Sequence, residues 1–144
     1  MDFLTNVSLK TKTTLALPGS AEYFCAVASW EDLRQALDFA RQKQLAVAIL
    51  GGGSNTVVTG EVSGLVIQVA NSGVEMIGED ESSVTLRVAA GENWHQLVMA
   101  TLAKGWYGLE NLALIPGCAG AAPIQNIGAY GVELTRFLVA VEVI

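Results

Sequence analysis

The chain has 144 residues, of which 51% are apolar and 15% charged, so it can fold as a globular domain around a buried core. Its net charge of −6 and its scattered basic residues exclude a surface for nucleic acid or for an anionic membrane. The N-terminus lacks a signal-peptide pattern and no stretch approaches the ~18 apolar residues of a spanning helix, so we expect neither secretion nor membrane insertion.

The two cysteines do not form a recognisable pair. Cys25 and Cys118 lie far apart, without C-x-x-C spacing and without a histidine companion. This spacing gives no support to a metal site or to a disulfide framework. We therefore expect two reduced thiols in a cytoplasmic protein, and no metal.

The first part of the chain alternates strand-like and helix-like patterns. Ser29 and Asp32 form an S-x-x-D pattern typical of a helix start, and apolar residues then recur at helical spacing. The sequence predicts a helix at residues 30–43 and strands at residues 23–28, 46–50 and 56–59, the second of them buried. The order strand, helix, strand, glycine loop is typical of the beginning of an α/β fold.

The rest of the chain combines further strands, one helix and a long irregular segment. Asn93 is the predicted N-cap of the helix, and Gly105 is its predicted end. Residues 108–131 carry small residues and prolines without a sustained period, which is typical of a binding loop. Strands are predicted at residues 64–69, 73–77, 84–89 and 137–144, with an acidic turn between the second and the third of these. Because the chain ends inside the last strand, we expect a truncated protein.

A glycine loop follows the strand at residues 46–50. Consecutive glycines let backbone N–H groups converge on an anion, and two polar side chains add further donors. The loop consists of Gly51, Gly52, Gly53, Ser54 and Asn55. It lacks the helix of a Rossmann loop and the lysine of a Walker A loop, which leaves FAD in another fold as the leading large anionic ligand. The alternative is a tight turn without a ligand.

A second loop at residues 115–131 combines a run of small residues with the amides of Gln125 and Asn126. Flat backbone beside two amides suits a planar polar ring such as a flavin. The alternative is a structural loop whose amides cap neighbouring backbone groups.

Few side chains in the chain are candidates for acid–base chemistry. His95 is the only histidine, and no second ligand or nucleophile lies near it in the sequence. Glu92 and Glu110 are each well placed to support a helix start. Trp30 and Trp94 are expected to pack in helix core faces. We assign no catalytic residue.

Three motifs together are more specific than any one of them. LGGGSN at 50–55, AGENW at 90–94 and GLENLALIPGCAGAAPIQNIGAYGVE at 108–133 resemble the UDP-N-acetylenolpyruvoylglucosamine reductases, over nearly the whole chain. SLKTKTTLAL at 8–17 is similar to the family's opening segment. Two parts of the chain depart from the family pattern. Residues 13–16 read TTLA where the family usually has NTFG, and Ala121 stands where some members have a hydroxyl residue.

The resemblance implies a fold of the vanillyl-alcohol-oxidase, or PCMH, type, an α/β (α+β) fold in which two lobes bind FAD. Residues 1–144 would then form an incomplete FAD-binding domain, with the first lobe at about 1–70, the start of the second at about 71–144, and no substrate domain. By resemblance, Gly51 to Asn55 would hold the pyrophosphate. The residues that would border the flavin are Ile115, Pro116, Gly117, Gly120, Ala121, Ala122, Gln125, Asn126, Ile127 and Gly128.

The family reaction would use NADPH to reduce FAD, and then the reduced flavin to convert UDP-N-acetylglucosamine enolpyruvate to UDP-N-acetylmuramate for peptidoglycan synthesis. The serine, arginine and glutamate that the family uses in this step belong to segments after residue 144, so the chain itself should be inactive. Two alternatives are another flavin oxidase or dehydrogenase of the PCMH type and a non-catalytic nucleotide-binding module. A UDP-sugar substrate is the expected partner beside the cofactors.

Overall fold

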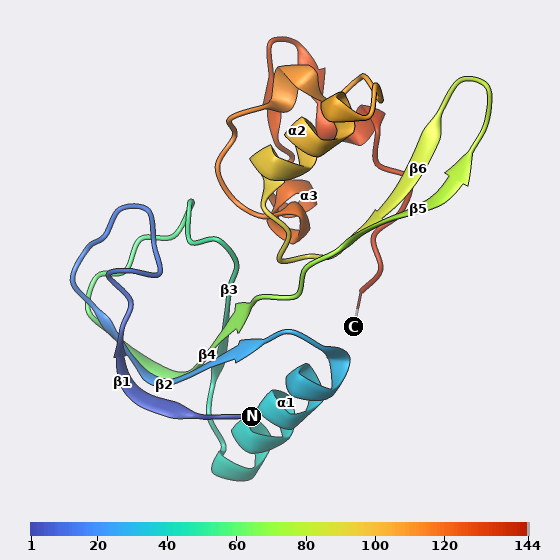
Figure 1. The fold of residues 1–144 in the computed structure, drawn as a ribbon. Helices are drawn as coiled ribbons and strands as arrows, with labels where there is room; N and C mark the ends of the chain where they lie inside the picture. Colours follow the sequence, from blue (N-terminus) through green and yellow to red (C-terminus); the bar gives the residue numbers. More distant parts are fainter. Residues whose placement is uncertain (144) are drawn as a thin grey trace. The chain divides into compact units, whose positions relative to one another are not determined.

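A computed structural model describes residues 1–143. The chain divides into two compact units, Met1–Ser72 and Gly73–Ile144, and each has its own core (Figure 1). Both units combine helices with strands, which confirms the predicted α/β class. None of the helices within residues 1–143 is both long and apolar enough to cross a membrane.

The first unit is built on a four-stranded sheet with the strand order β1-β2-β4-β3. Its elements are β1 (Leu4–Ser8), β2 (Ser20–Val27), α1 (Trp30–Lys43), β3 (Val47–Leu50) and β4 (Glu61–Val69). Strand β1 runs antiparallel to β2, whereas β2, β4 and β3 are parallel. The predicted strands at 23–28, 46–50 and 64–69 are therefore confirmed within a few residues at their ends.

Both faces of this sheet are covered because side chains alternate along each strand. On β4, Leu65 and Ile67 are fully buried beside Ala36 and Ala40 of α1. Val66, between them in sequence, is buried in a separate cluster with Leu50. Helix α1 therefore covers one face, and other segments of the unit cover the opposite face.

Helix α1 begins as predicted. The Ser29 hydroxyl accepts a hydrogen bond of 3.1 Å from the Asp32 N–H, and the Asp32 carboxylate accepts one of 3.1 Å from the Ala28 N–H. The expected packing of Trp30 is wrong, because 57% of this residue is exposed. The helix contacts the sheet through Ala36, and Trp30 lies roughly 120° around the helix from that residue.

Three strand predictions need correction. Strand β3 is not buried, because it is an edge strand: Val47 is 40% exposed and Ile49 is 62% exposed. Residues 56–59 are irregular, since Val58 packs into the core beside Gly19 instead of joining a ladder. Within the described residues, 137–143 contain no strand, and Phe137 and Leu138 instead complete a turn by donating to the Leu134 carbonyl.

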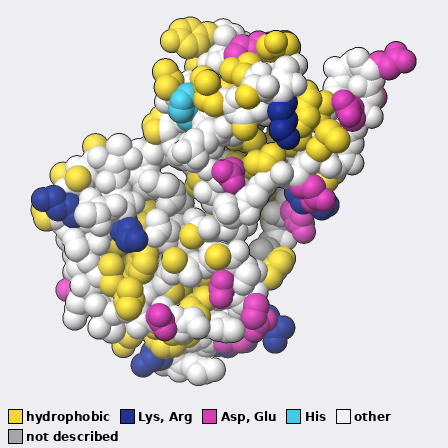
Figure 2. All heavy atoms as spheres, viewed as in Figure 1, with side chains coloured by type: hydrophobic (Ala, Val, Ile, Leu, Met, Phe, Trp, Pro, Cys, Tyr) yellow, Lys and Arg dark blue, Asp and Glu magenta, His cyan; other side chains and the backbone are white. Residues whose placement is uncertain are grey.

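Figure 2 shows hydrophobic side chains at the surface of both units.

The second unit combines a hairpin, one helix and several short elements. They are β5 (Val74–Glu79), β6 (Val84–Val88), α2 (Trp94–Ala103), the 3-10 helices η1 (Glu110–Leu112), η2 (Ala119–Ala121) and η3 (Leu134–Arg136), α3 (Ala122–Gln125), β7 (Gly128–Ala129) and β8 (Val132–Glu133). The hairpin and α2 were predicted, and the Asn93 side chain caps α2 by accepting from the Gln96 N–H. The segment 108–131, predicted to be a loop, also contains short helices and a small hairpin.

The acidic turn between β5 and β6 is organised by one carboxylate. Asp80 accepts hydrogen bonds from the backbone and side chains of Ser82 and Ser83. These bonds, the Ser82 backbone bond first, lower the pKa of Asp80 to about 2. The carboxylate is therefore ionised at neutral pH and fixes the hairpin turn.

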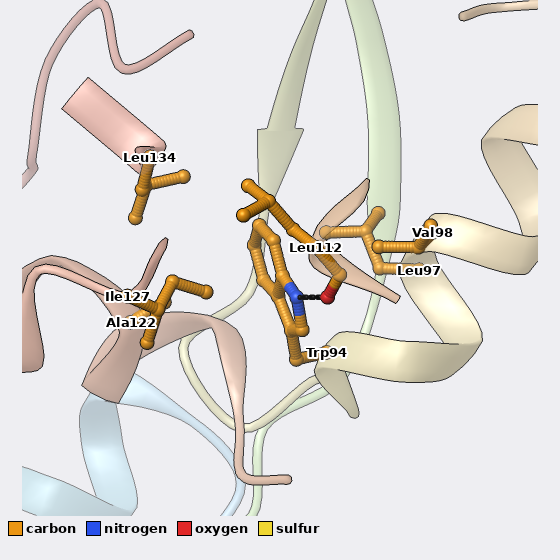
Figure 3. Packing of buried hydrophobic residues seen from close by; sticks show 7 residues of the cluster. All are labelled: Trp94, Leu97, Val98, Leu112, Ala122, Ile127 and Leu134. Carbon is orange, nitrogen blue, oxygen red and sulfur yellow. Dashed lines mark hydrogen bonds between the residues drawn. The ribbon is translucent and has the colours of Figure 1, made fainter. Parts of the chain in front are cut away.

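The core of the second unit surrounds Trp94, which is 4% exposed (Figure 3). Its indole lies among side chains from α2, η1, α3 and η3 and one side chain that follows α3. They are Leu97, Val98, Leu112, Ala122, Ile127 and Leu134. The indole Nε1–H donates a buried hydrogen bond of 2.8 Å to the Leu112 carbonyl. The predicted packing role of Trp94 is therefore confirmed.

The two tryptophans allow a matched test of this core. Trp94→Phe should lower the free energy of unfolding by about 1–3 kcal/mol, because the buried Leu112 carbonyl loses its donor and the core loses volume. Trp30→Phe, at an exposed site, should change it by less than about 0.5 kcal/mol. Urea unfolding followed by circular dichroism measures both variants, and equal effects would contradict the central role of Trp94.

Candidate functional site

The first glycine loop connects β3 to the segment before β4. Gly53 is buried and has a positive φ of 66°, whereas Gly52 and Asn55 are exposed. Gly53 needs to be glycine for a reason within the chain, because an added Cβ would lie 2.2 Å from the Lys12 carbonyl oxygen. Gly53 therefore packs directly against the backbone of residues 12–13 and fixes the position of the exposed part of the loop.

The support for this loop comes from a turn far away in sequence. The Thr14 N–H donates a hydrogen bond of 3.0 Å to the Gly53 carbonyl. Thr13 is buried, and its hydroxyl donates to the Leu9 carbonyl at 3.4 Å. Lys12 donates to Gln68 at 3.3 Å, and its ammonium lies 5.0 Å from the centre of the Phe24 ring.

Sequence reasoning did not associate residues 12–14 with the glycine loop. The signal that could have found them is the similarity of residues 8–17 to the family's opening segment. In the structure, Thr13 is one of the few buried polar residues. The supporting turn also contains a positively charged residue, Lys12, whereas the glycine loop has no basic residue of its own.

The second loop is held by backbone hydrogen bonds to the segment just before α2 and to the first residue of α2. The Trp94 N–H donates to Gly117 at 3.1 Å, the Ala119 N–H to Glu92 at 2.8 Å, and the Gly120 N–H to Ala90 at 2.8 Å. A Cβ at Gly120 would lie 2.6 Å from the Ala90 Cβ. The motif AGENW at 90–94 therefore works as the support of the loop.

Most of the predicted residues of the second loop meet around one small hollow. It is lined by Ile115, Pro116, Gly117, Ala121, Ala122, Gln125 and Ile127, together with Trp94 and Cys118. Asn126 and Gly128 line a different hollow, beside Arg136 and the β7–β8 hairpin. Gly120 packs on Ala90.

Some of these residues have structural roles. Ala122 and Ile127 are buried in the core. Asn126 adopts the left-handed conformation that ends α3, and its N–H donates to the Ala122 and Pro123 carbonyls. Gln125 and Pro116 are exposed. The parts of the loop that a ligand can reach therefore include the Gln125 amide and the backbone near Pro116.

The two loops, one in each unit, are alike in having no acidic residue of their own. Residues 51–55 and 115–128 contain no Asp or Glu, so no side chain within these ranges repels phosphate. Glu133 lies beside Gly128, where Arg136 lines the same hollow. The available polar groups are backbone amides and neutral side chains, which hold a diphosphate by hydrogen bonds and dipoles. Taken by itself, each loop offers groups that fit a part of FAD.

The three titratable candidates hold backbone groups. Glu92 accepts from the Gly73 N–H at 2.9 Å, and His95 accepts from the Leu114 N–H at 3.2 Å. Glu110 accepts from the Gly108 N–H at 2.5 Å, and hydrogen bonds from its own backbone N–H and from Gly108 lower the pKa of Glu110. Each of these side chains stabilises a loop.

The cysteines lie in separate units. Cys25 and Cys118 are both buried and free. Burial, followed by the negative charge of Asp32, raises the pKa of Cys25, so this thiol stays protonated and unreactive. Among residues 1–143, no group of three or more His, Cys, Asp or Glu side chains could hold a metal ion.

A protein-family model described as "FAD binding domain" matches residues 21–144, a range that includes both loops. UDP-N-acetylenolpyruvoylglucosamine reductase of Chromobacterium violaceum is 45% identical over 98% of this chain and 41% of its own length. The protein of the same name from Dechloromonas aromatica is 49% identical over 93% of this chain and 39% of its own length. The chain thus spans about two fifths of these curated relatives.

A solved structure agrees with these relatives. The crystal structure of UDP-N-acetylenolpyruvylglucosamine reductase (MurB) from Thermus caldophilus is similar with a TM-score of 0.68 and 30% identity. The similarity covers 92% of this chain and 44% of that chain. The flavoprotein fold that the sequence predicted is thereby confirmed, whereas the assignment of individual site residues stays a prediction.

Two glycines test the support of the first loop. Gly53→Ala should lower the free energy of unfolding by about 2–4 kcal/mol, because its Cβ meets the Lys12 carbonyl and its φ is positive. Gly60→Ala is the control, since an added Cβ there meets nothing within 4 Å. Thermal and urea unfolding measure both variants. Tolerance of Gly53→Ala would show that the loop does not pack on residues 12–14.

Proposed function

The chain belongs to the FAD binding domain family, and on this premise we propose that it is the FAD-binding part of a UDP-N-acetylenolpyruvoylglucosamine reductase. The observation that carries the proposal is the family match over residues 21–144, which contains both glycine-rich loops. When bound, FAD supplies the two-electron chemistry that side chains lack. The chain's own residues have to bind, orient and shield it.

We assign the diphosphate of FAD to Gly51, Gly52, Gly53, Ser54 and Asn55. The exposure of Gly52 and Asn55 supports this assignment, as does the absence of acidic residues in the loop. Gly53 and the turn at 12–14 hold the loop in shape without the ligand, so the backbone is preorganised for an anion. Lys12 in that turn adds a positive charge that favours a dianionic group.

We assign the flavin to the second loop, at Ile115–Ala122 and Gln125–Gly128. The neutral, small side chains at 117 and 119–122 let a flat ring approach the backbone. Gln125 is exposed and can donate and accept hydrogen bonds at the edge of a ring. The backbone bonds to residues 90–94 keep this surface in place.

The reaction that we propose for the longer protein is the NADPH-dependent reduction of UDP-N-acetylglucosamine enolpyruvate to UDP-N-acetylmuramate, a step of peptidoglycan synthesis. The similarity to two UDP-N-acetylenolpyruvoylglucosamine reductases supports the reduction of this substrate. We place it in the cytoplasm, which agrees with two free, buried thiols. A proton donor and the groups that stabilise the developing charge would be needed in addition.

Two other functions remain as alternatives. Another flavin oxidase or dehydrogenase would also bind FAD but would not use the enolpyruvyl substrate. A non-catalytic nucleotide-binding module would bind a nucleotide without flavin absorbance. The identity of 45–49% to the named reductases favours the first proposal over both.

The cofactor proposal can be tested at Gly52. The purified chain should bind FAD, seen as flavin absorbance and as quenched flavin fluorescence, and Gly52→Val should reduce the affinity by at least about a hundredfold because a branched side chain blocks the backbone. Gly60→Val is the control, since it adds the same side chain where there is space. Unchanged FAD affinity in Gly52→Val would remove the diphosphate assignment.

The activity proposal can be tested with the chain alone. FAD-loaded protein should not oxidise NADPH in a manner that depends on UDP-N-acetylglucosamine enolpyruvate, because Glu92, His95 and Glu110 are engaged with backbone N–H groups. Without an acid or charge stabilisation, the rate should fall by at least about four orders of magnitude. Formation of UDP-N-acetylmuramate near the rate of a full-length relative would show that a catalytic residue lies within residues 1–144.

A further inference from the structure

The first turn of α2 holds the second loop through two neighbouring side chains. Trp94 donates its indole N–H to the Leu112 carbonyl at 2.8 Å. His95 accepts the Leu114 N–H at its Nδ1 atom at 3.2 Å. One of these bonds is buried in the core, whereas the other lies at the surface, where the histidine appears in cyan in Figure 2.

Leu114 has an unfavourable conformation for its residue type. Its φ is +64°, in the left-handed region, and 78% of the residue is exposed. This conformation is unfavourable for a residue with a Cβ, so surrounding contacts must hold it. With most of the leucine side chain in solvent, its burial contributes little, which makes the hydrogen bond from its N–H important.

The conformation of Leu114 determines where the next residues go. Ile115, Pro116 and Gly117 follow it directly and begin the second loop, to which we assign the flavin. Gly117 is also held by α2, because its carbonyl accepts the Trp94 N–H at 3.1 Å. Residues 115 and 116 therefore lie between two positions of the chain that His95 and Trp94, adjacent residues of α2, hold by hydrogen bonds.

We propose that His95 is a positioning residue for FAD: its Nδ1 holds Leu114 in the left-handed conformation and so places the backbone of Ile115–Gly117 for the flavin. This inference rests on the proposed function of the second loop. The role requires an imidazole whose Nδ1 carries no proton, so that Nε2 carries it in the neutral ring. His95 acts on the ligand only through the loop.

The role makes a specific prediction for two substitutions. Phe in place of His95 keeps a ring of similar size but removes the acceptor, whereas Asn keeps an acceptor oxygen near the position of Nδ1. Met99→Phe is the control, because it introduces the same aromatic residue at an exposed position of α2, whereas His95 is half-buried. Any effect of an added phenyl ring on the helix should appear in both Phe variants.

The experiment measures FAD affinity by flavin fluorescence, the amide exchange rate of Leu114, and the melting temperature. His95→Phe should weaken FAD binding about fivefold and raise the Leu114 exchange rate about tenfold, while its melting temperature stays close to that of Met99→Phe. His95→Asn should restore most of the affinity and most of the exchange protection. This rescue is not expected if the imidazole only fills space.

The other outcomes distinguish this inference from the proposed function. If the unsubstituted chain binds FAD and His95→Phe binds it equally well, the inference is wrong and the proposed function stands. If His95→Asn loses as much affinity as His95→Phe, the acceptor role is wrong. If the unsubstituted chain binds no FAD, the proposed function fails and the role of His95 in FAD binding fails with it. If His95→Phe does not fold, the test rests on His95→Asn. A folded His95→Asn whose Leu114 amide exchanges without protection would overturn the inference.

Discussion

The second unit depends on the buried hydrogen bond between the Trp94 indole and the Leu112 carbonyl. The indole fills the centre of the core and also fixes a backbone group of the irregular segment, so packing and hydrogen bonding act at one point. From this point the chain runs two residues to the strained Leu114 and on to the loop that we assign to the flavin. Without the bond, the carbonyl would be buried without a donor, and the segment that leads into the loop would lose its contact with the core.

The glycines in the two loops divide into two kinds. Gly53 and Gly120 lie so close to other parts of the chain that a Cβ would meet Lys12 or Ala90, so they serve the fold itself. Gly52 is exposed, and its small size leaves room for a ligand. A run such as GGG can therefore combine both requirements within neighbouring positions. The distinction explains why a glycine-rich motif alone does not identify a binding site.

The sequence predicted the features that depend on residues close together in the chain. The Ser29 cap, the Asn93 cap and the turn at Asp80 all depend on hydrogen bonds within a few residues, and all are present. The exposure of Ile49 could not be predicted, because it follows from the edge position of β3 in the sheet. The turn at residues 12–14 was missed for the same reason, since its contact with Gly53 joins segments about forty residues apart. Of the candidate site, the sequence gives the loops and their polarity, whereas their supports require the fold.

The charge distribution resolves an apparent conflict between the acidic chain and an anionic cofactor. A net charge of −6 disfavours a diphosphate at long range, but screening limits that effect to about 8 Å at physiological salt. Within that distance the local groups decide, and residues 51–55 and 115–128 carry no acidic side chain. The neighbouring sequence motifs contain Glu92, Glu110 and Glu133. Glu92 and Glu110 each accept a backbone N–H, which disperses part of their negative charge, and Glu133 lines a hollow together with Arg136. An acidic protein can thus present neutral, amide-lined loops to a dianion, and the selectivity for FAD then comes from shape and hydrogen bonds more than from net charge.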